Sequence, residues 1–311
     1  MIPASSSDYI FSAQLRGKYR SSLPVVALES TVITHGLPRP QNLQLARNME
    51  KVVRGEGAIP ATIAVLDGRI HLGLTDVELE RLAGENGMRK ISPRDFAAAI
   101  LQKASGGTTV AGTIFAASRA GFRVMATGGI GGVHPQPPFD ISADLQTLAE
   151  TPMLVICSGA KAVLDLPATM EHLETHGVPV VGYQTEEFPA FYSRGSGLPV
   201  GIRLETPQEV VEFAQEHWHL GARSAVLITQ PPMQASALPY DEMKKVIQQG
   251  QQEAAAQGIR GQALTPFLLQ RLSELTGGAT LKANLDLLQN NAKLAARIAC
   301  ILHLQDRRQH V

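Results

Sequence analysis

The chain has 311 residues and no formal net charge, because 28 basic side chains balance 28 acidic ones. Hydrophobic residues make up 44% and charged residues 18%, which is typical of a compact soluble enzyme with a large core. Without a basic excess, a nucleic-acid polymer is not an expected partner, whereas a small phosphorylated ligand remains compatible. Two distant cysteines, no 18-residue apolar run and no signal-like N-terminus predict a reduced, cytoplasmic protein that does not bind a membrane.

The first unusual feature in chain order is a carboxylate at the end of a strand. Residues 1–22 are predicted to be an N-terminal arm, and the apolar, β-branched stretch Leu23–Leu28 then predicts a short buried strand. That strand leads directly into Glu29. Ligands of open α/β sheets collect at the carboxyl ends of strands, so Glu29 is a candidate site residue. The alternative is a glutamate that caps or pairs locally.

Lys90 is the next charged residue of interest, and its surroundings predict little about it. The elements before it are a helix over 42–54, a strand over 60–66 and a return strand over 69–72 after an Asp-Gly turn. A helix start follows at Ser92, where a serine cap precedes a proline. By position alone, Lys90 is expected to be a solvated surface lysine.

The stretch Ala126–Leu145, ATGGIGGVHPQPPFDISADL, is the most informative part of the chain. An apolar strand precedes its glycines, and a helix is predicted to begin at Ser142. Bare N–H groups of a glycine-rich loop and a helix N-terminus suit an anion, while nearby carboxylates suit a hard cation. The alternative is a simple turn. The glycine spacing matches neither the dinucleotide fingerprint nor the P-loop, so neither is supported.

Lys161 also follows a buried strand, over Met153–Cys157. It stands in the sequence SGAKAVLDL, a turn that is predicted to start a helix. A lysine in such apolar surroundings can have a depressed pKa and act as an amine nucleophile. The alternative is a lysine whose stem covers apolar surface while its ammonium group reaches water.

The rest of the chain continues the alternation of strands and helices. Strands are predicted over 178–183 and 224–229, and the last two helices over 265–275 and 281–302, with Asn284 in the first turn of the final one. Asn290 and Asn291 lie mid-helix, where propensity disfavours them; buried hydrogen bonds would explain them, and exposure is the alternative. The alternation predicts a single layered α/β/α domain with a mainly parallel central sheet over 23–311.

Several motifs together resemble one known family. ALEST, HGLPRPQN, GAIPATIAVLDG, ATGGIGGVH, FDISADL, SGAKAVLDL and TPFLL occur in order and without a large gap. From about Leu23 onward the chain is similar to the pseudouridine-5′-phosphate glycosidases (pseudouridylate synthases). The resemblance implies an α/β homotrimer that reversibly cleaves the carbon–carbon glycosidic bond of pseudouridine 5′-phosphate, giving uracil and ribose 5-phosphate. It also implies Mn²⁺ or another divalent cation. The segment HPQPPFD is shorter and richer in proline than expected for the family.

Carried over position by position, the resemblance implies roles for individual residues. Glu29 would be the proton donor, Lys161 the covalent nucleophile through a Schiff base with ring-opened ribose, and Asp140 the metal ligand. The implied substrate-binding residues are Lys90, Val110, His134, Ser142, Ala143, Asp144 and Asn284. The alternatives are a sugar-phosphate aldolase, an N-nucleosidase, or a non-enzymatic sugar-phosphate sensor. The two enzyme alternatives would explain Lys161 or Glu29, but not all the motifs together. The sensor would need Glu29 or Lys161 to be lost, and both are present.

Overall fold

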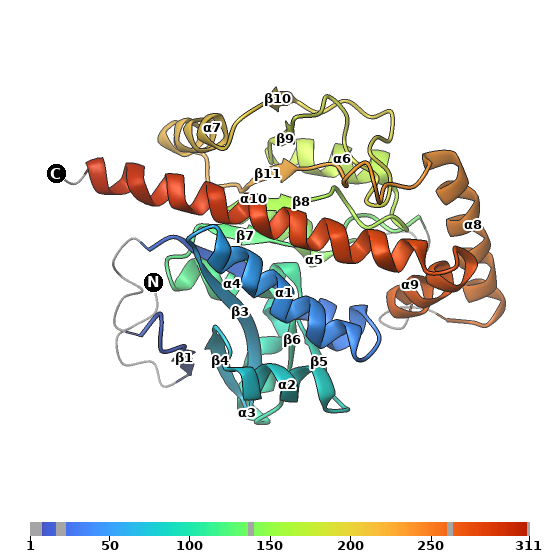
Figure 1. Ribbon diagram of the computed structural model, residues 1–311, viewed down its shortest axis with the longest axis horizontal. Coiled ribbons are helices and arrows are strands. Elements are labelled where there is room, and N and C mark those ends of the chain that lie inside the picture. Colours follow the sequence, from blue (N-terminus) through green and yellow to red (C-terminus); the bar gives the residue numbers. More distant parts are fainter. Residues whose placement is uncertain (1–7, 17–22, 136–139, 260–263, 310–311) are drawn as a thin grey trace.

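The computed structural model describes residues 8–16, 23–135, 140–259 and 264–309 (Figure 1). Their strands form one sheet, in which β6 pairs with β3, β5 pairs with β6, and the others follow a single path. In order along that path the strands are β1 (Tyr9–Phe11), β4 (Arg69–Leu72), β3 (Ile59–Leu66), β2 (Val25–Leu28), β7 (Val124–Ala126), β8 (Leu154–Cys157), β11 (Val226–Thr229), β9 (Val180–Tyr183) and β10 (Ile202–Leu204). The remaining two are β5 (Arg89–Ile91) and β6 (Gly106–Thr108).

The sheet is mainly parallel, as predicted. Strand β3 pairs antiparallel with β4 and β6, and the other pairings between these named strands are parallel. The central strands are buried along their whole length, which is why β8 (LVIC) and β11 (VLIT) consist almost entirely of apolar residues. Since β2, β7 and β8 are adjacent and parallel, their carboxyl ends meet at one edge of the sheet.

Helices cover both faces of the sheet and confirm the layered α/β/α prediction (Figure 1). Helix α10 crosses β2, β7 and β8 and packs between α1 and α7, while α4 and α5 pack against each other behind the sheet. The helices of these two layers are α1 (Gln41–Gly55), α4 (Val110–Arg119), α5 (Ala143–Glu150), α7 (Pro207–His219) and α10 (Ala279–Gln309). The others are α2 (Asp76–Gly84), α3 (Phe96–Leu101), α6 (Leu166–Thr175), α8 (Tyr240–Ala256) and α9 (Leu264–Leu275), with two short turns, η1 (Val32–Gly36) and η2 (Pro93–Asp95). None of the described helices is long and apolar enough to cross a membrane.

Local differences from the sequence predictions have a common cause. The strands β5, β6 and β10 have only three residues each, too few for a recognisable period-two pattern, and they form because neighbouring strands pair with them. Within the range predicted as an arm, β1 adds to β4 in parallel register, and residues 1–7 and 17–22 lie outside the described ones. The turn that holds Lys161 does not open a helix directly, since α6 begins only after its N-cap residue Asp165.

Candidate active site

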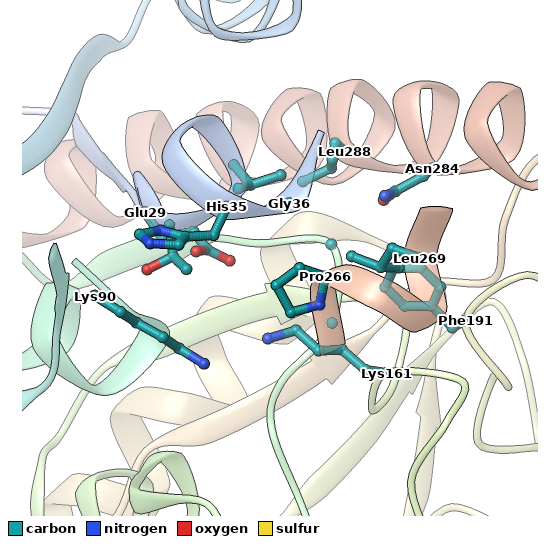
Figure 2. A pocket seen from close by; sticks show the side chains of 14 residues that line it. Glu29, His35, Gly36, Lys90, Lys161, Phe191, Pro266, Leu269, Asn284 and Leu288 are labelled. Atoms are coloured by element: carbon teal, nitrogen blue, oxygen red, sulfur yellow. The ribbon is translucent and has the colours of Figure 1, made fainter. Parts of the chain in front are cut away.

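Two predicted catalytic side chains meet at the carboxyl edge of the sheet. Glu29 directly follows β2, Gly128 and Gly129 follow β7, and Lys161 follows β8, and all of them line one pocket (Figure 2). In that view the amine of Lys161 points into the space that Glu29 and Lys90 also face. The other lining residues are Thr31, Val32, His35, Gly36, Phe191, Pro266, Leu269, Asn284 and Leu288. Glu29 and Lys161 come together because β2 and β8 flank β7.

Glu29 is only 6% exposed, and its surroundings favour the protonated form. Burial raises the pKa of the Glu29 carboxyl, opposed by the positive charge of Lys161 and by a hydrogen bond of 2.8 Å that Thr127 Oγ1 donates to its Oε1. Burial is the largest of these effects, so the pKa of Glu29 lies above the ordinary carboxyl value, as expected for a carboxyl buried at a strand end. A carboxylic acid with a raised pKa keeps its proton to higher pH, which suits general acid catalysis.

A tight glycine turn places Lys161 in the pocket. Gly159 has a φ of 85°, and a Cβ there would collide with the carbonyl of Pro189, so this position requires glycine. The backbone N–H of Lys161 donates to the carbonyl of Ile130 at 3.0 Å, and Ile130 N–H donates to the carbonyl of Gly159 at 3.1 Å. These bonds join the lysine turn to the glycine-rich loop.

Lys90 lies on β5, and its side chain lines the pocket instead of being a solvated surface group. Burial lowers the pKa of Lys90, and the nearby positive charge of Lys161 lowers it further. The surface interpretation of Lys90 from its sequence position was therefore wrong. Its placement depends on β5 pairing with β6, which in turn pairs with β3.

Asp144 organises the glycine-rich loop from the first turn of α5. Its carboxylate is buried and accepts the backbone N–H of Ala111 at 2.8 Å and that of Gly131 at 2.7 Å. Ser142 caps α5 by accepting the N–H of Asp144, and a Cβ at Gly131 would collide with Ser142 Oγ. Asp144 thus links the start of α4, the loop and the start of α5.

Four of the predicted substrate-binding residues surround this loop without lining the pocket of Glu29 and Lys161. Val110 is the buried first residue of α4, and Ser142, Ala143 and Asp144 open α5. Two helix N-termini therefore converge on the loop, an arrangement that favours anions such as a phosphate. The predictions for these residues stay predictions.

His134 and Asp140 flank the segment 136–139, which lies outside the described residues. The backbone N–H of His134 donates to the carbonyl of Asp140 at 2.9 Å. Burial lowers the pKa of His134, and the negative charge of Asp140 opposes that shift. Within the described part of the chain, no group of three His, Cys, Asp or Glu side chains could hold a metal ion. The donors present fit a cation held by one protein carboxylate and otherwise by water, as Mg²⁺ and Mn²⁺ can be.

The other end of the pocket is apolar except for Asn284. Asn284 is 5% exposed on α10, and Phe191, Leu269 and Leu288 lie around the same space (Figure 2). Reasoning from the sequence included Asn284 but missed Phe191 and the α9 residues. The TPFLL motif was the available signal for α9, because it was part of the family resemblance although no chemistry could be assigned to it.

His35 and Thr31 were also missed, and both belong to the segment that follows Glu29. A five-residue π-helical turn, η1, carries His35 to the pocket, and turns of this kind are frequent at functional sites. His35 Nδ1 and Thr34 Oγ1 share a hydrogen bond of 2.7 Å, and burial lowers the pKa of His35, as does the charge of Lys90. A neutral imidazole is therefore favoured in this pocket.

Replacing Asp144 by alanine is expected to destabilise the protein by about 3 kcal/mol, because two buried backbone N–H groups lose their charged acceptor. Urea unfolding in the presence of a chelator measures this change. The matched control is Asp140→Ala, which removes a half-buried carboxylate nearby and is expected to change stability by about 0.5 kcal/mol or less. Equal unfolding midpoints for the two variants would show that Asp144 does not hold the loop.

The mainly parallel sheet, with a buried carboxylic acid and a lysine in one pocket at its carboxyl edge, has the architecture of an α/β enzyme, in which ligands collect at the carboxyl ends of the strands. A family model described as "Indigoidine synthase A like protein" matches residues 14–301. The chain is 51% identical to a protein of Solibacter usitatus and 48% identical to one of Geobacillus kaustophilus, both named pseudouridine-5′-phosphate glycosidase. These matches cover 94% and 93% of this chain, and 98% and 97% of the relatives.

Two solved structures share the fold. An indigoidine synthase A-like protein of Thermotoga maritima has 36% identity and a TM-score of 0.88, over 97% of this chain and all of that one. The prealnumycin C-glycosynthase AlnA, solved in complex with ribulose 5-phosphate, has 37% identity and a TM-score of 0.89, over 97% and 99%. The chain belongs to the pseudouridine-5′-phosphate glycosidase family of indigoidine synthase A-like proteins. This membership confirms both the family resemblance and the prediction of an enzyme.

Proposed function

We propose that this enzyme reversibly cleaves the carbon–carbon glycosidic bond of pseudouridine 5′-phosphate, giving uracil and ribose 5-phosphate. The observation that carries the proposal is the pocket that buried Glu29 and Lys161 both line, from the ends of β2 and β8 on either side of β7. The printed names of the relatives support the substrate, and the ribulose 5-phosphate bound to AlnA supports a sugar phosphate as ligand. A role in pseudouridine and nucleotide catabolism follows from this substrate.

The chemistry of the bond explains why both an acid and an amine are needed. Protonation of a leaving nitrogen cannot help, because uracil leaves through carbon. Glu29 instead gives its proton to the ring oxygen of ribose as the bond from that oxygen to the anomeric carbon breaks. The raised pKa of Glu29 keeps this proton available.

Lys161 then forms the covalent intermediate. Its neutral amine adds to the electrophilic anomeric carbon and loses a proton. Cleavage of the carbon–carbon bond follows when the uracil carbon takes up a proton, and the nitrogen lone pair becomes the second bond of an iminium on Lys161. Water hydrolyses the iminium, which releases ribose 5-phosphate and restores the amine. A covalent step divides one difficult reaction into easier ones.

The remaining groups are proposed to bind and orient the substrate. Lys90 supplies a cation, and the loop between the starts of α4 and α5 supplies N–H groups for the phosphate. The apolar end of the pocket, together with Asn284, is proposed to bind the uracil base. Asp140 is proposed to hold Mn²⁺ or a similar hydrated cation, which would orient and polarise the substrate. The homotrimer and the cytoplasmic location stay predictions.

The test is uracil release from pseudouridine 5′-phosphate by the full chain with Mn²⁺, compared with release from uridine 5′-phosphate. Release from pseudouridine 5′-phosphate alone is the expected result, because the proposed route opens the ribose ring and then protonates the uracil carbon that is bonded to the anomeric carbon. Release from uridine 5′-phosphate alone would identify an N-nucleosidase. Release from neither would overturn the proposed substrate.

A further inference from the structure

A buried asparagine on α10 contacts two of the strand ends that carry the site. Asn291 is 0% exposed and lies mid-helix, where asparagine is a poor helix former. Its side-chain amide donates to the carbonyl of Thr127 at 2.9 Å and to Ser158 Oγ at 3.1 Å. These bonds confirm the expectation that buried hydrogen bonds explain the residue.

Both partners of Asn291 lead directly to catalytic side chains. Thr127 follows β7, and its hydroxyl donates to Glu29 at 2.8 Å. Ser158 follows β8 and opens the turn that ends at Lys161. Its backbone N–H donates to the carbonyl of Gly128 at 2.8 Å, so the ends of β7 and β8 are also joined to each other. One amide therefore connects the supports of the acid and of the amine.

The close approach of α10 to the glycine-rich loop makes this contact possible. A Cβ on Gly128 would lie 3.2 Å from side-chain carbons of both Leu287 and Leu288, which is closer than most Cβ contacts and shows how closely α10 approaches the loop. The surrounding buried positions of α10 are filled by leucine and alanine. A leucine at 291 would favour the helix and avoid burying an amide, so packing alone does not explain asparagine there.

We propose that Asn291 is a positioning residue that sets the relative placement of Glu29 and Lys161 by bridging the ends of β7 and β8. It does not line the pocket and acts only through Thr127 and Ser158. This inference rests on the proposed function, because it assigns Glu29 and Lys161 to one reaction. A displacement of either group by about 1 Å is enough to slow such a reaction about 10²-fold.

The test compares Asn291→Leu with Asn290→Leu, which changes the same residue type at the preceding position of the helix. Asn291→Leu is expected to lower kcat for uracil release by about 10²-fold with little change in KM. The high-pH limb of its pH profile is expected to shift to higher pH, because weakening the hydrogen bond from Thr127 raises the pKa of Glu29 further. Asn290→Leu is expected to behave as the wild type does.

Ser158→Ala removes the hydroxyl that accepts a hydrogen bond from Asn291. It tests the same bridge if Asn291→Leu does not fold. It is expected to lower kcat by a smaller factor, and the double variant is expected to be no slower than Asn291→Leu alone. A wild-type pH profile in Asn291→Leu, or loss of activity only in proportion to the unfolded fraction, would overturn the proposal. So would unchanged kcat in Ser158→Ala if Asn291→Leu does not fold.

The failure of the proposed function can be distinguished from failure of this inference. If the wild type releases no uracil, the substrate assignment fails. Asn291 is then judged from a crystal structure of Asn291→Leu, in which the bond from Thr127 to Glu29 is expected to be lost. A structure that keeps this bond and the position of Lys161 would overturn the positioning role.

Discussion

Lys161→Ala is expected to abolish uracil release, with a fall in kcat of roughly 10⁴-fold or more, because the variant has no amine to add to the anomeric carbon. Lys161→Arg is expected to be equally inactive, since it keeps the positive charge but offers no neutral nucleophile at accessible pH. The measurement is uracil release with Mn²⁺ at saturating pseudouridine 5′-phosphate. Equal release by wild type and Lys161→Ala would show that the lysine assignment is wrong and would favour a mechanism based on carboxylates.

Reductive trapping tests the covalent intermediate separately from turnover. Ribose 5-phosphate and borohydride are expected to add one sugar phosphate to the wild type, and peptide mass spectrometry is expected to locate it on Lys161. The matched control is Lys90→Ala, which removes the other lysine of the pocket. That variant is expected to be trapped on Lys161, although more ribose 5-phosphate is needed. Trapping on Lys90 instead would exchange the proposed roles of the two lysines.

Glu29→Gln is expected to lower kcat by about 10²- to 10⁴-fold, the usual contribution of a positioned general acid. Glutamine can still accept the hydrogen bond from Thr127, so the variant removes the transferable proton and preserves that contact. In the wild type, uracil release is expected to decline as pH rises through the raised pKa of Glu29, because only its protonated form donates. This limb of the profile is expected to be absent from the residual activity of Glu29→Gln.

The same substitution has an opposite effect on stability. The pKa of Glu29 is higher in the folded than in the unfolded chain, so the folded state binds more protons between the two values. The free energy of unfolding therefore falls as pH rises from the ordinary carboxyl pKa through the raised one. Glu29→Gln avoids this loss and is expected to unfold at an equal or higher urea concentration than the wild type above neutral pH. A lower midpoint there would contradict the predicted cost of ionising Glu29.

Local sequence signals were sufficient for the frame of the site. The apolar runs that became β2, β7 and β8 are short and flanked by turn residues, so the strands and the positions of Glu29 and Lys161 at their ends were predictable. The alternation of strands and helices correctly predicted a mainly parallel, layered sheet. These features depend on periodicity along the chain, which the sequence contains directly.

Roles within the site were less accessible from local signals. Lysines at positions such as Lys90 and Lys161 have ordinary surface alternatives, and the family motifs were needed to assign them chemistry. For Lys90 the local interpretation pointed to the surface, because a three-residue strand such as β5 has no recognisable pattern of its own. Its existence depends on pairing with β6, a contact between segments that are distant in sequence.

What the sequence by itself determined was which residues end buried strands, because burial on both faces requires the continuous apolar runs that precede Glu29 and Lys161. The tertiary structure alone decided that β7 lies between β2 and β8, that Lys90 and Leu269 reach the same pocket, and that Asn291 bridges Thr127 and Ser158. The bond from Asn291 to Thr127 alone joins residues 164 positions apart. No local periodicity encodes such contacts, since they form only when the whole sheet and its covering helices pack together.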